Sequence, residues 1–247
     1  MSTEPKSNSP GNATFAKTRW SLVLEAGRRS SADSRQALES LCELYWYPLY
    51  GYARRRVANR AEAEDLTQGF FAELIEKNYV AAATPDRGRF RAFLLTAFRN
   101  FLSKQWEKAK AQKRGGGRKP IPIDFDSADS RFCLEPVSSL TAEQFYDRQW
   151  AVALLGQTLE RLQREFVRAD KEQQFHELKG FLIGEHSGTT YQDVAARLNM
   201  TVAAVKMAAS RMRRRYRELL RDEIGQTVSG PHEIDDEIRN LFATLEL

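Results

Sequence analysis

The sequence predicts an all-α protein built from two helical domains joined by a linker. Apolar residues recur every three or four positions in several long stretches, which is the spacing of one helix face. No stretch of useful length alternates apolar and polar residues with period two, so no strand is predicted. Between the two halves, Gly, Pro, Ser and Asp interrupt the helical pattern.

Five segments follow from this pattern. They are a tail at residues 1–18, a first helical domain at 19–112, a linker at 113–143, a second helical domain at 144–222 and an acidic C-terminal extension at 223–247. The tail is rich in Ser, Thr, Asn and Pro and has few large apolar groups. We therefore expect it to be flexible, because it has little apolar surface to bury.

The first domain is expected to hold an opening pair of helical stretches. Residues 37–56 carry apolar side chains spaced by three and four, and Pro48 among them predicts a kink or a break. Residues 61–77 form an amphipathic helix whose stripe of Leu66, Phe70 and Leu74 leaves an acidic outer face. The turn formers of residues 78–88 predict a loop after it.

Residues 89–112 give the strongest helical pattern in the chain. Eight apolar side chains, five of them aromatic, follow helical spacing: Phe90, Phe93, Leu94, Ala97, Phe98, Phe101, Leu102 and Trp106. The other side carries Arg91, Arg99, Asn100, Lys104 and Lys108. Three consecutive glycines at 115–117 end the helix, since each is unfavourable inside one.

The second domain is expected to begin with helices around residues 155–166 and 175–182. A short helix at 191–198 and a longer one at 202–220 follow, with Asn199 in a left-handed turn and Thr201 as N-cap. This is the pattern of a helix-turn-helix. Its predicted core is Val194, Leu198, Met200, Val202, Val205, Ala209, Met212, Tyr216 and Leu219. The opposite face shows Ala203, Ala204, Lys206, Met207, Ser210, Arg211 and Arg214.

Charge is distributed unevenly around a formal net charge of +5. Residues 61–76 hold five acids and no Lys or Arg, whereas residues 99–119 and 206–221 are strongly basic. Two basic stretches indicate a polyanion contacted at two places, although solvated helix faces would give the same composition. The C-terminal extension ends in an amphipathic pattern that predicts a short acidic helix. That helix could cover the second domain, imitate DNA, bind a regulator or simply pack.

Enzymes, metal proteins and membrane proteins fit the sequence poorly. The three histidines do not show ligand spacing, no nucleophile motif is present, and we predict neither a catalytic residue, a metal site nor a cofactor. No apolar run approaches the length of a membrane-spanning helix. The two distant cysteines and the lack of a secretory signal lead us to expect a cytoplasmic protein.

Two groups of residues, in this order, resemble bacterial RNA polymerase sigma factors of the sigma-70 family. Residues 63–71 and 90–100 are similar to the acidic helix and the DNA-melting helix of region 2. Residues 190–214 resemble region 4, which binds duplex DNA through a helix-turn-helix. Regions 1 and 3 of the housekeeping factors are not visible, a pattern similar to the extracytoplasmic-function (ECF) class. The resemblance covers about residues 20–221.

This resemblance implies roles for the residues already described. Core RNA polymerase would be bound by Glu64, Asp65, Gln68 and Glu73. The melted minus-10 strand would be bound by Arg91, Arg99, Asn100, Lys104 and Lys108, with a flipped base held by the loop at 78–88. The minus-35 duplex would be read by the exposed face of the second helix of the helix-turn-helix. An anti-sigma regulator is a further partner that the family suggests, and no membrane contact is implied.

The sequence departs from the family pattern at two places, and two other functions remain as alternatives. Gly69 stands where the acidic helix of the family usually has Glu, and residues 155–188 are longer than usual. A one-component helix-turn-helix regulator would bind duplex DNA without polymerase. A helical adaptor with solvated basic faces would bind DNA weakly and without sequence preference.

Overall fold

The computed structural model describes residues 32–82, 89–111, 132, 140–183, 188–225, 228 and 230–246. It is all-α, as predicted, and these residues include no β-strand. The predicted flexible tail and most of the predicted linker lie outside the described residues. Within the described part of the chain, no helix combines the length and apolar character needed to cross a bilayer.

The helices predicted in the first half are confirmed, with small shifts of their ends. They are α2 (Ala32–Arg54), α3 (Arg60–Glu76) and α4 (Phe90–Ala111). Of the kink or break predicted at Pro48, the break is wrong, because α2 runs through this residue. Part of the predicted loop after α3 is a 3-10 turn, η1 (Tyr79–Ala82), and residues 83–88 are outside the described part.

The second half opens with a helix much longer than predicted. Helix α6 (Ala142–Arg168) begins at a capping box in which the Thr141 hydroxyl accepts from the Gln144 amide and the Gln144 side chain accepts from the Thr141 amide. It is followed by α7 (Glu172–Leu178), α8 (Gly180–Ile183), α9 (Tyr191–Arg197) and α10 (Val202–Gly225). The predicted C-terminal helix is present as η3 (Pro231–Glu233) and α11 (Ile234–Leu245).

Two apolar cores are buried among the described residues. The first core joins α2, α3 and α4 to the N-terminal half of α6 and to the ends of α10 and α11, and it is strongly aromatic, with Tyr45, Phe70, Phe98 and Trp150 at its centre. The second core joins the C-terminal half of α6 to α7, α8, α9 and most of α10. All nine side chains predicted as the core of the helix-turn-helix belong to or pack against it.

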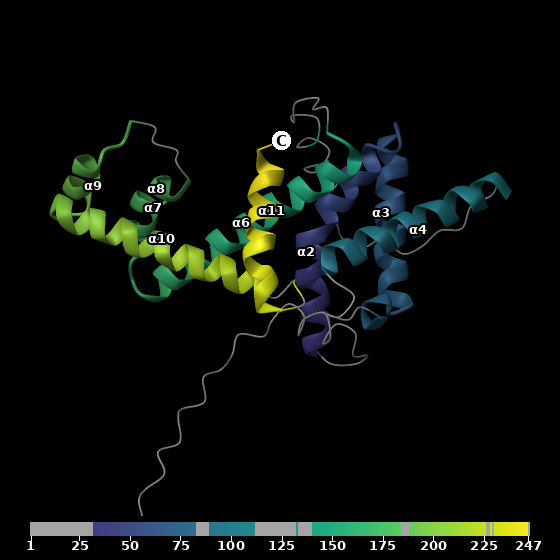
Figure 1. Cartoon of the computed structure of the whole chain (residues 1–247), viewed down its shortest axis with the longest axis horizontal. Helices are drawn as coiled ribbons and strands as arrows, with labels where there is room; N and C mark the ends of the chain where they lie inside the picture. Colours follow the sequence, from purple (N-terminus) through teal and green to yellow (C-terminus); the bar gives the residue numbers. More distant parts are fainter. Residues whose placement is uncertain are drawn as a thin grey trace, which may run out of the picture.

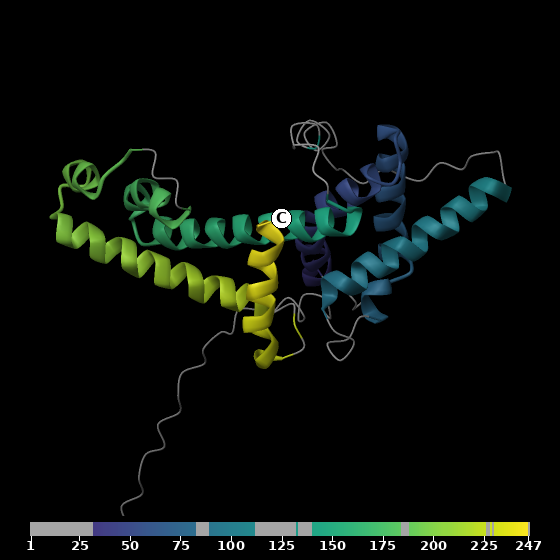
Figure 2. The same cartoon turned by 45° about the horizontal axis from the view of Figure 1, so that its top comes forward.

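Helices α6 and α10 both contribute to the two cores, and α6 connects them through its length. In Figures 1 and 2 it runs through the middle of the molecule, with α2, α3 and α4 at one end and α7, α8 and α9 at the other. Its N-terminal half lies close to α2, since a Cβ added to Gly51 would stand 2.1 Å from Phe145 Cε1. The predicted division into domains stays a prediction, but the two cores are connected by a continuous helix.

Candidate nucleic-acid interface

Helix α3 presents three of the four residues predicted to bind polymerase. Its N-cap is Asn59, whose side chain accepts a hydrogen bond from the Ala61 amide at 2.9 Å. Asp65 is exposed, Gln68 is half-buried, and Glu64 is half-buried in an ion pair with Arg60 at 2.6 Å. Because they stand three and four positions apart, Glu64, Asp65 and Gln68 share one helix face.

Glu73, the fourth residue of that set, is not on this face. Its side chain is 5% exposed, and its carboxylate accepts from Lys77 Nζ at 2.6 Å and from the Tyr79 hydroxyl at 2.7 Å. The bond to Glu73 raises the pKa of Tyr79, as does burial. The prediction of an exposed Glu73 was wrong because η1 folds back over this side of α3.

Helix α4 exposes a polar ridge formed by four of the five residues predicted to bind the melted strand. Arg99, Asn100, Lys104 and Lys108 are all exposed. Both ribbon views show the C-terminal part of α4 projecting from the rest of the molecule (Figures 1 and 2). Trp106 is half-buried against the first core, so its main role is packing. We call Arg99, Asn100, Lys104 and Lys108 the α4 ridge.

A small cavity opens directly beside the α4 ridge. Its volume is about 250 Å³, and its walls come from α3, η1 and α4. Asn100 and Lys104 line one side, whereas the Tyr79 and Phe93 rings supply aromatic surface. Aromatic rings next to a basic surface are the groups on which single-stranded bases stack. Tyr79 lies in the loop predicted to hold a flipped base, although it was not singled out there, whereas Phe93 was missed because it lay in a predicted core stripe.

Arg91, the fifth residue of the predicted minus-10 set, differs from the ridge. Its side chain is 11% exposed, with Nε 2.8 Å from Glu237 Oε1 and Nη1 in contact with Asp147. Its guanidinium carbon lies 4.8 Å from the Trp150 ring centre. Burial opposes its charge, but the bond to Glu237 and the charge of Asp147 outweigh burial and raise the Arg91 pKa. In this conformation Arg91 is therefore not available to DNA.

At the opposite end of the molecule, α9 and α10 form a tightly connected pair. A capping box starts α9, where the Thr190 amide donates to Asp193 Oδ2 at 2.8 Å and the Asp193 amide donates to Thr190 Oγ1 at 3.3 Å. The Thr190 hydroxyl also donates to Asp193 Oδ2, at 2.7 Å, and this bond together with that from the Thr190 amide lowers the Asp193 pKa.

The turn of this pair has the predicted conformation. Asn199 has φ 51°, in the left-handed region, and the Met200 amide closes the turn by donating to Ala195 O at 2.9 Å. Thr201 then caps α10, accepting from the Ala204 amide at 3.2 Å. The two helices therefore meet at a fixed angle, which fixes the direction in which α10 points its outer face.

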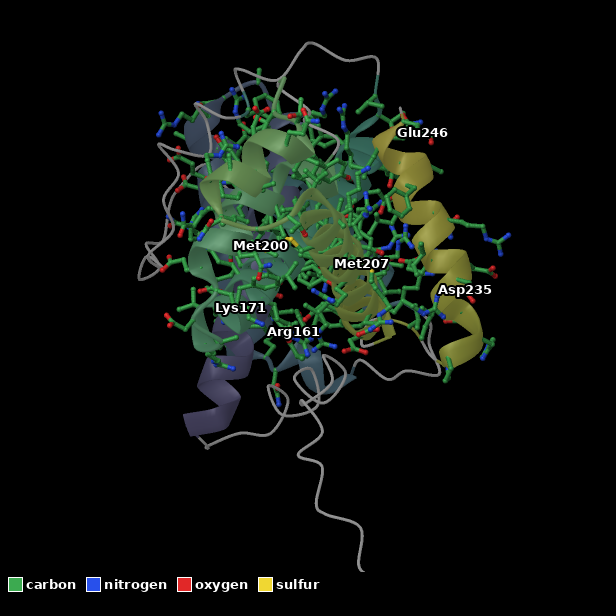
Figure 3. The ribbon with its side chains drawn as sticks, turned by 90° about the vertical axis from the view of Figure 1, so that its left-hand side faces the viewer. Arg161, Lys171, Met200, Met207, Asp235 and Glu246 are labelled. Atoms are coloured by element: carbon green, nitrogen blue, oxygen red, sulfur yellow. The ribbon has the colours of Figure 1, made fainter. Side chains whose placement is uncertain are left out.

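Helix α10 exposes the face predicted to read duplex DNA. Of the seven residues, six are exposed and Ala204 is half-buried, the full set being Ala203, Ala204, Lys206, Met207, Ser210, Arg211 and Arg214. Met207 is 58% exposed, the largest value among the exposed large apolar side chains of the described residues. Figure 3 looks at this end of the molecule, with Met207 and Met200 on the side formed by α9 and α10 and Asp235 of α11 to one side. We call these seven residues the α10 face.

An ion pair between Arg215 and α6 adds to the packing that holds α10 in place. Arg215 makes two parallel hydrogen bonds, from Nε and Nη2, to the Glu165 carboxylate of α6, each 2.8 Å long. The bond to Arg215 lowers the Glu165 pKa, and burial opposes this only in part.

Among the described residues, no group of His, Cys, Asp or Glu is arranged to hold a metal ion.

Comparison with known protein families gives a match in the first half of the chain. Residues 43–112 match the family model of sigma-70 region 2, a stretch that contains most of α2, all of α3 and α4, and the cavity between them. The match supports a sigma factor of the sigma-70 family, a family of non-enzymatic proteins that recognise promoters and initiate transcription. No curated protein and no solved structure gives a significant match to the chain.

Proposed function

We propose that this chain is a sigma factor of the ECF class. It would bind core RNA polymerase through α3, the melted minus-10 strand through the α4 ridge, and the minus-35 duplex through the α10 face. The observation that carries the proposal is the α4 ridge, because its residues Asn100 and Lys104 line an aromatic cavity inside the stretch that matches sigma-70 region 2.

The α4 ridge is suited to a single strand with one base turned out of the stack. Lys104 and Arg99 neutralise backbone phosphates, which is the main source of affinity for nucleic acids. Extruding a base is unfavourable by a few kcal/mol, and stacking on a ring such as Tyr79 or Phe93 offsets that loss. A volume of about 250 Å³ limits the cavity to one base or part of one. Asn100 at its edge offers both a donor and an acceptor.

The α10 face is suited to duplex DNA read by a helix-turn-helix. The first two turns carry the small residues Ala203 and Ala204, which let a helix approach base edges closely, and the exposed thioether of Met207 offers an apolar contact. Arg211 and Arg214 follow further along and would bind phosphates. A solvated basic face would explain these charges equally well, and the two interpretations differ in the effect of the variants described below.

Polymerase binding is assigned to the face of α3 that holds Glu64, Asp65 and Gln68. Asp65 on this face is exposed, and none of its three residues lines the cavity beside the α4 ridge, so a protein could occupy it while DNA occupies α4. Joining polymerase, minus-10 and minus-35 contacts in one chain raises the effective concentration of each contact once another has formed. A one-component regulator would need neither the α3 face nor the α4 ridge.

Transcription in vitro with purified core polymerase and paired variants tests the proposal. Arg211→Ala with Arg214→Ala should abolish dependence on the minus-35 element but leave polymerase binding unchanged. The matched control, Arg164→Ala with Arg168→Ala, removes the same charge from exposed sites on α6 and should transcribe normally. Loss of polymerase binding in the α10 variant would contradict the assignment of its face.

A second pair of variants tests α3. Asp65→Ala with Gln68→Ala should weaken polymerase binding without changing DNA contacts, whereas Glu172→Ala with Gln173→Ala on α7 should have no effect. Unchanged polymerase affinity in the α3 variant would remove α3 from the proposed interface.

A further inference from the structure

The carboxylate of Glu237 is buried between two arginines of the first half of the chain. Its side chain is 0% exposed. Oε2 lies 2.9 Å from Arg89 Nη1, and Oε1 lies 2.8 Å from Arg91 Nε. These partners are 146 and 148 residues away in sequence, so the contact joins the C-terminal extension to the start of α4.

A carboxylate in this position is stable only while it is paired. Moving a charge out of water is unfavourable by several kcal/mol unless good ion pairs replace the lost hydration. Both arginines supply such pairs, and Asp147 of α6 shares Arg91. An apolar residue at position 237 would hold a helix against a core more simply. The carboxylate therefore indicates that the two arginines form a site for an anion, which Glu237 occupies in this conformation.

Beyond Glu237, α11 packs against the first core through Leu241 and through three half-buried apolar side chains, Ile234, Ile238 and Leu245. Only Glu237 and Leu241 of this helix are buried. A cavity of about 720 Å³ opens between parts of α11, α6 and α10, although α11 also contacts both helices, and Phe242 on its wall is 47% exposed. The ion pair of Asp235 with Arg221 has exposed partners, and such pairs contribute little. The space between α11 and its neighbours is thus only partly filled. The buried ion pairs of this helix are those of Glu237 with the two arginines at the start of α4.

Arg89 and Arg91 also stand at the N-terminus of α4, on the helix that carries the α4 ridge. The first turn of α4 has no acidic residue, and a helix N-terminus favours anions. At about 1.5 Å per residue, Arg91 and Lys108 are about 25 Å apart along the axis, so the two arginines extend the basic track of α4 toward its beginning. Figure 1 shows α11 standing between this part of the molecule and α10.

We propose that Arg89 and Arg91 form a binding site for a backbone phosphate of single-stranded DNA, and that Glu237 fills this site when α11 is docked. Helix α11 is then an intramolecular competitor: DNA that enters the site displaces the Glu237 carboxylate and releases the helix. The inference rests on the proposed function, since it needs the strand that binds the α4 ridge. It adds a phosphate site, with Arg89 as a new member, and a means of regulating that site.

The test is the affinity of the full chain, without polymerase, for a short fluorescein-labelled single-stranded DNA at several salt concentrations. Glu237→Gln keeps the size and hydrogen-bonding capacity of the side chain but removes its charge. We expect it to bind DNA about 5- to 50-fold more tightly than wild type, the range of a typical coupling between two sites. The salt slope should stay close to that of wild type, because the same phosphate is bound in both once Glu237 no longer occupies the site.

Two matched variants separate competition from a general change of charge. Asp236→Asn removes one exposed charge from the same helix and should leave the affinity within about twofold and the slope unchanged. Adding Arg89→Ala and Arg91→Ala to Glu237→Gln should remove the whole gain. An equal gain in Asp236→Asn, or a gain that survives loss of both arginines, would overturn the proposal.

Hydrogen exchange of the wild-type chain gives a readout that a purely structural ion pair would not move. Exchange of the amides of α11 should increase when the single-stranded DNA binds, because the helix is released. Unchanged or slower exchange in α11 on DNA binding would show that α11 has only a structural role. A folded Glu237→Gln variant with wild-type affinity would show the same. Polymerase binding by wild type is unaffected by those outcomes, so failure of this proposal and failure of the sigma-factor proposal are distinguishable.

Discussion

Replacing Gly51 by Ala should destabilise the protein, although Ala is the better helix former. A Cβ at this position of α2 would lie 2.1 Å from Phe145 Cε1 and 3.0 Å from two further atoms of that ring. Carbon atoms in contact stand about 3.5–4.0 Å apart, so the ring would have to move by roughly 1.5 Å. Phe145 is 1% exposed and packs under the Arg55 guanidinium, 4.6 Å from the ring centre.

The magnitude follows from two opposing effects. Gly to Ala inside a helix gains about 1 kcal/mol, whereas overpacking a filled core loses about 1–3 kcal/mol or more. The clash is with a fixed aromatic ring rather than the end of a flexible chain, so we expect the upper part of that range and a net loss of about 1–2 kcal/mol. The control is Gly156→Ala on α6, where a Cβ meets nothing within 4 Å and the helix-propensity gain should remain.

Urea unfolding of the two variants measures this difference directly. Gly51→Ala should lower, and Gly156→Ala should raise, the free energy of unfolding relative to wild type. Equal stability of the two variants would refute the close approach of α2 and α6, and with it the shared helix that connects the two cores.

Three further results are expected. Glu165→Gln should lower stability by less than about 1 kcal/mol at neutral pH. Because the pairing with Arg215 lowers the Glu165 pKa, that difference should hold above about pH 5 and vanish as the pH falls through the folded-state pKa, which acid-range urea titrations would detect. Asn199→Ala should lower the melting temperature while Asn199→Gly does not, since φ is 51°. Arg211→Ala with Arg214→Ala should flatten the salt slope of duplex binding by about 1.8, measured by fluorescence anisotropy.

Local pattern was enough to predict the elements that carry the proposed surfaces. The spacing of Phe70, Leu74 and their neighbours predicted α3, and the apolar stripe of residues 90–106 predicted α4. Turn chemistry predicted the left-handed Asn199 and the cap at Thr201. Each of these depends on residues within a few positions of one another, which is why a single sequence sufficed.

Long-range partners were not predictable in the same way. Arg91 lies on the polar side of α4 and was expected to face DNA, yet Asp147 and Glu237 hold it from two other helices. Glu73 was expected on the acidic face of α3, but the Tyr79 hydroxyl reaches it from η1. The length of α6 was underestimated. Its first half packs against α2, and the sequence around it shows no sign of that partner.

Binding to core RNA polymerase tests the central claim most directly. Purified protein mixed with sigma-free bacterial core polymerase should co-elute in gel filtration, and the complex should give promoter-dependent transcripts from a library of genomic DNA. Separate elution together with sequence-specific binding to duplex DNA alone would contradict the sigma-factor proposal and favour a one-component regulator.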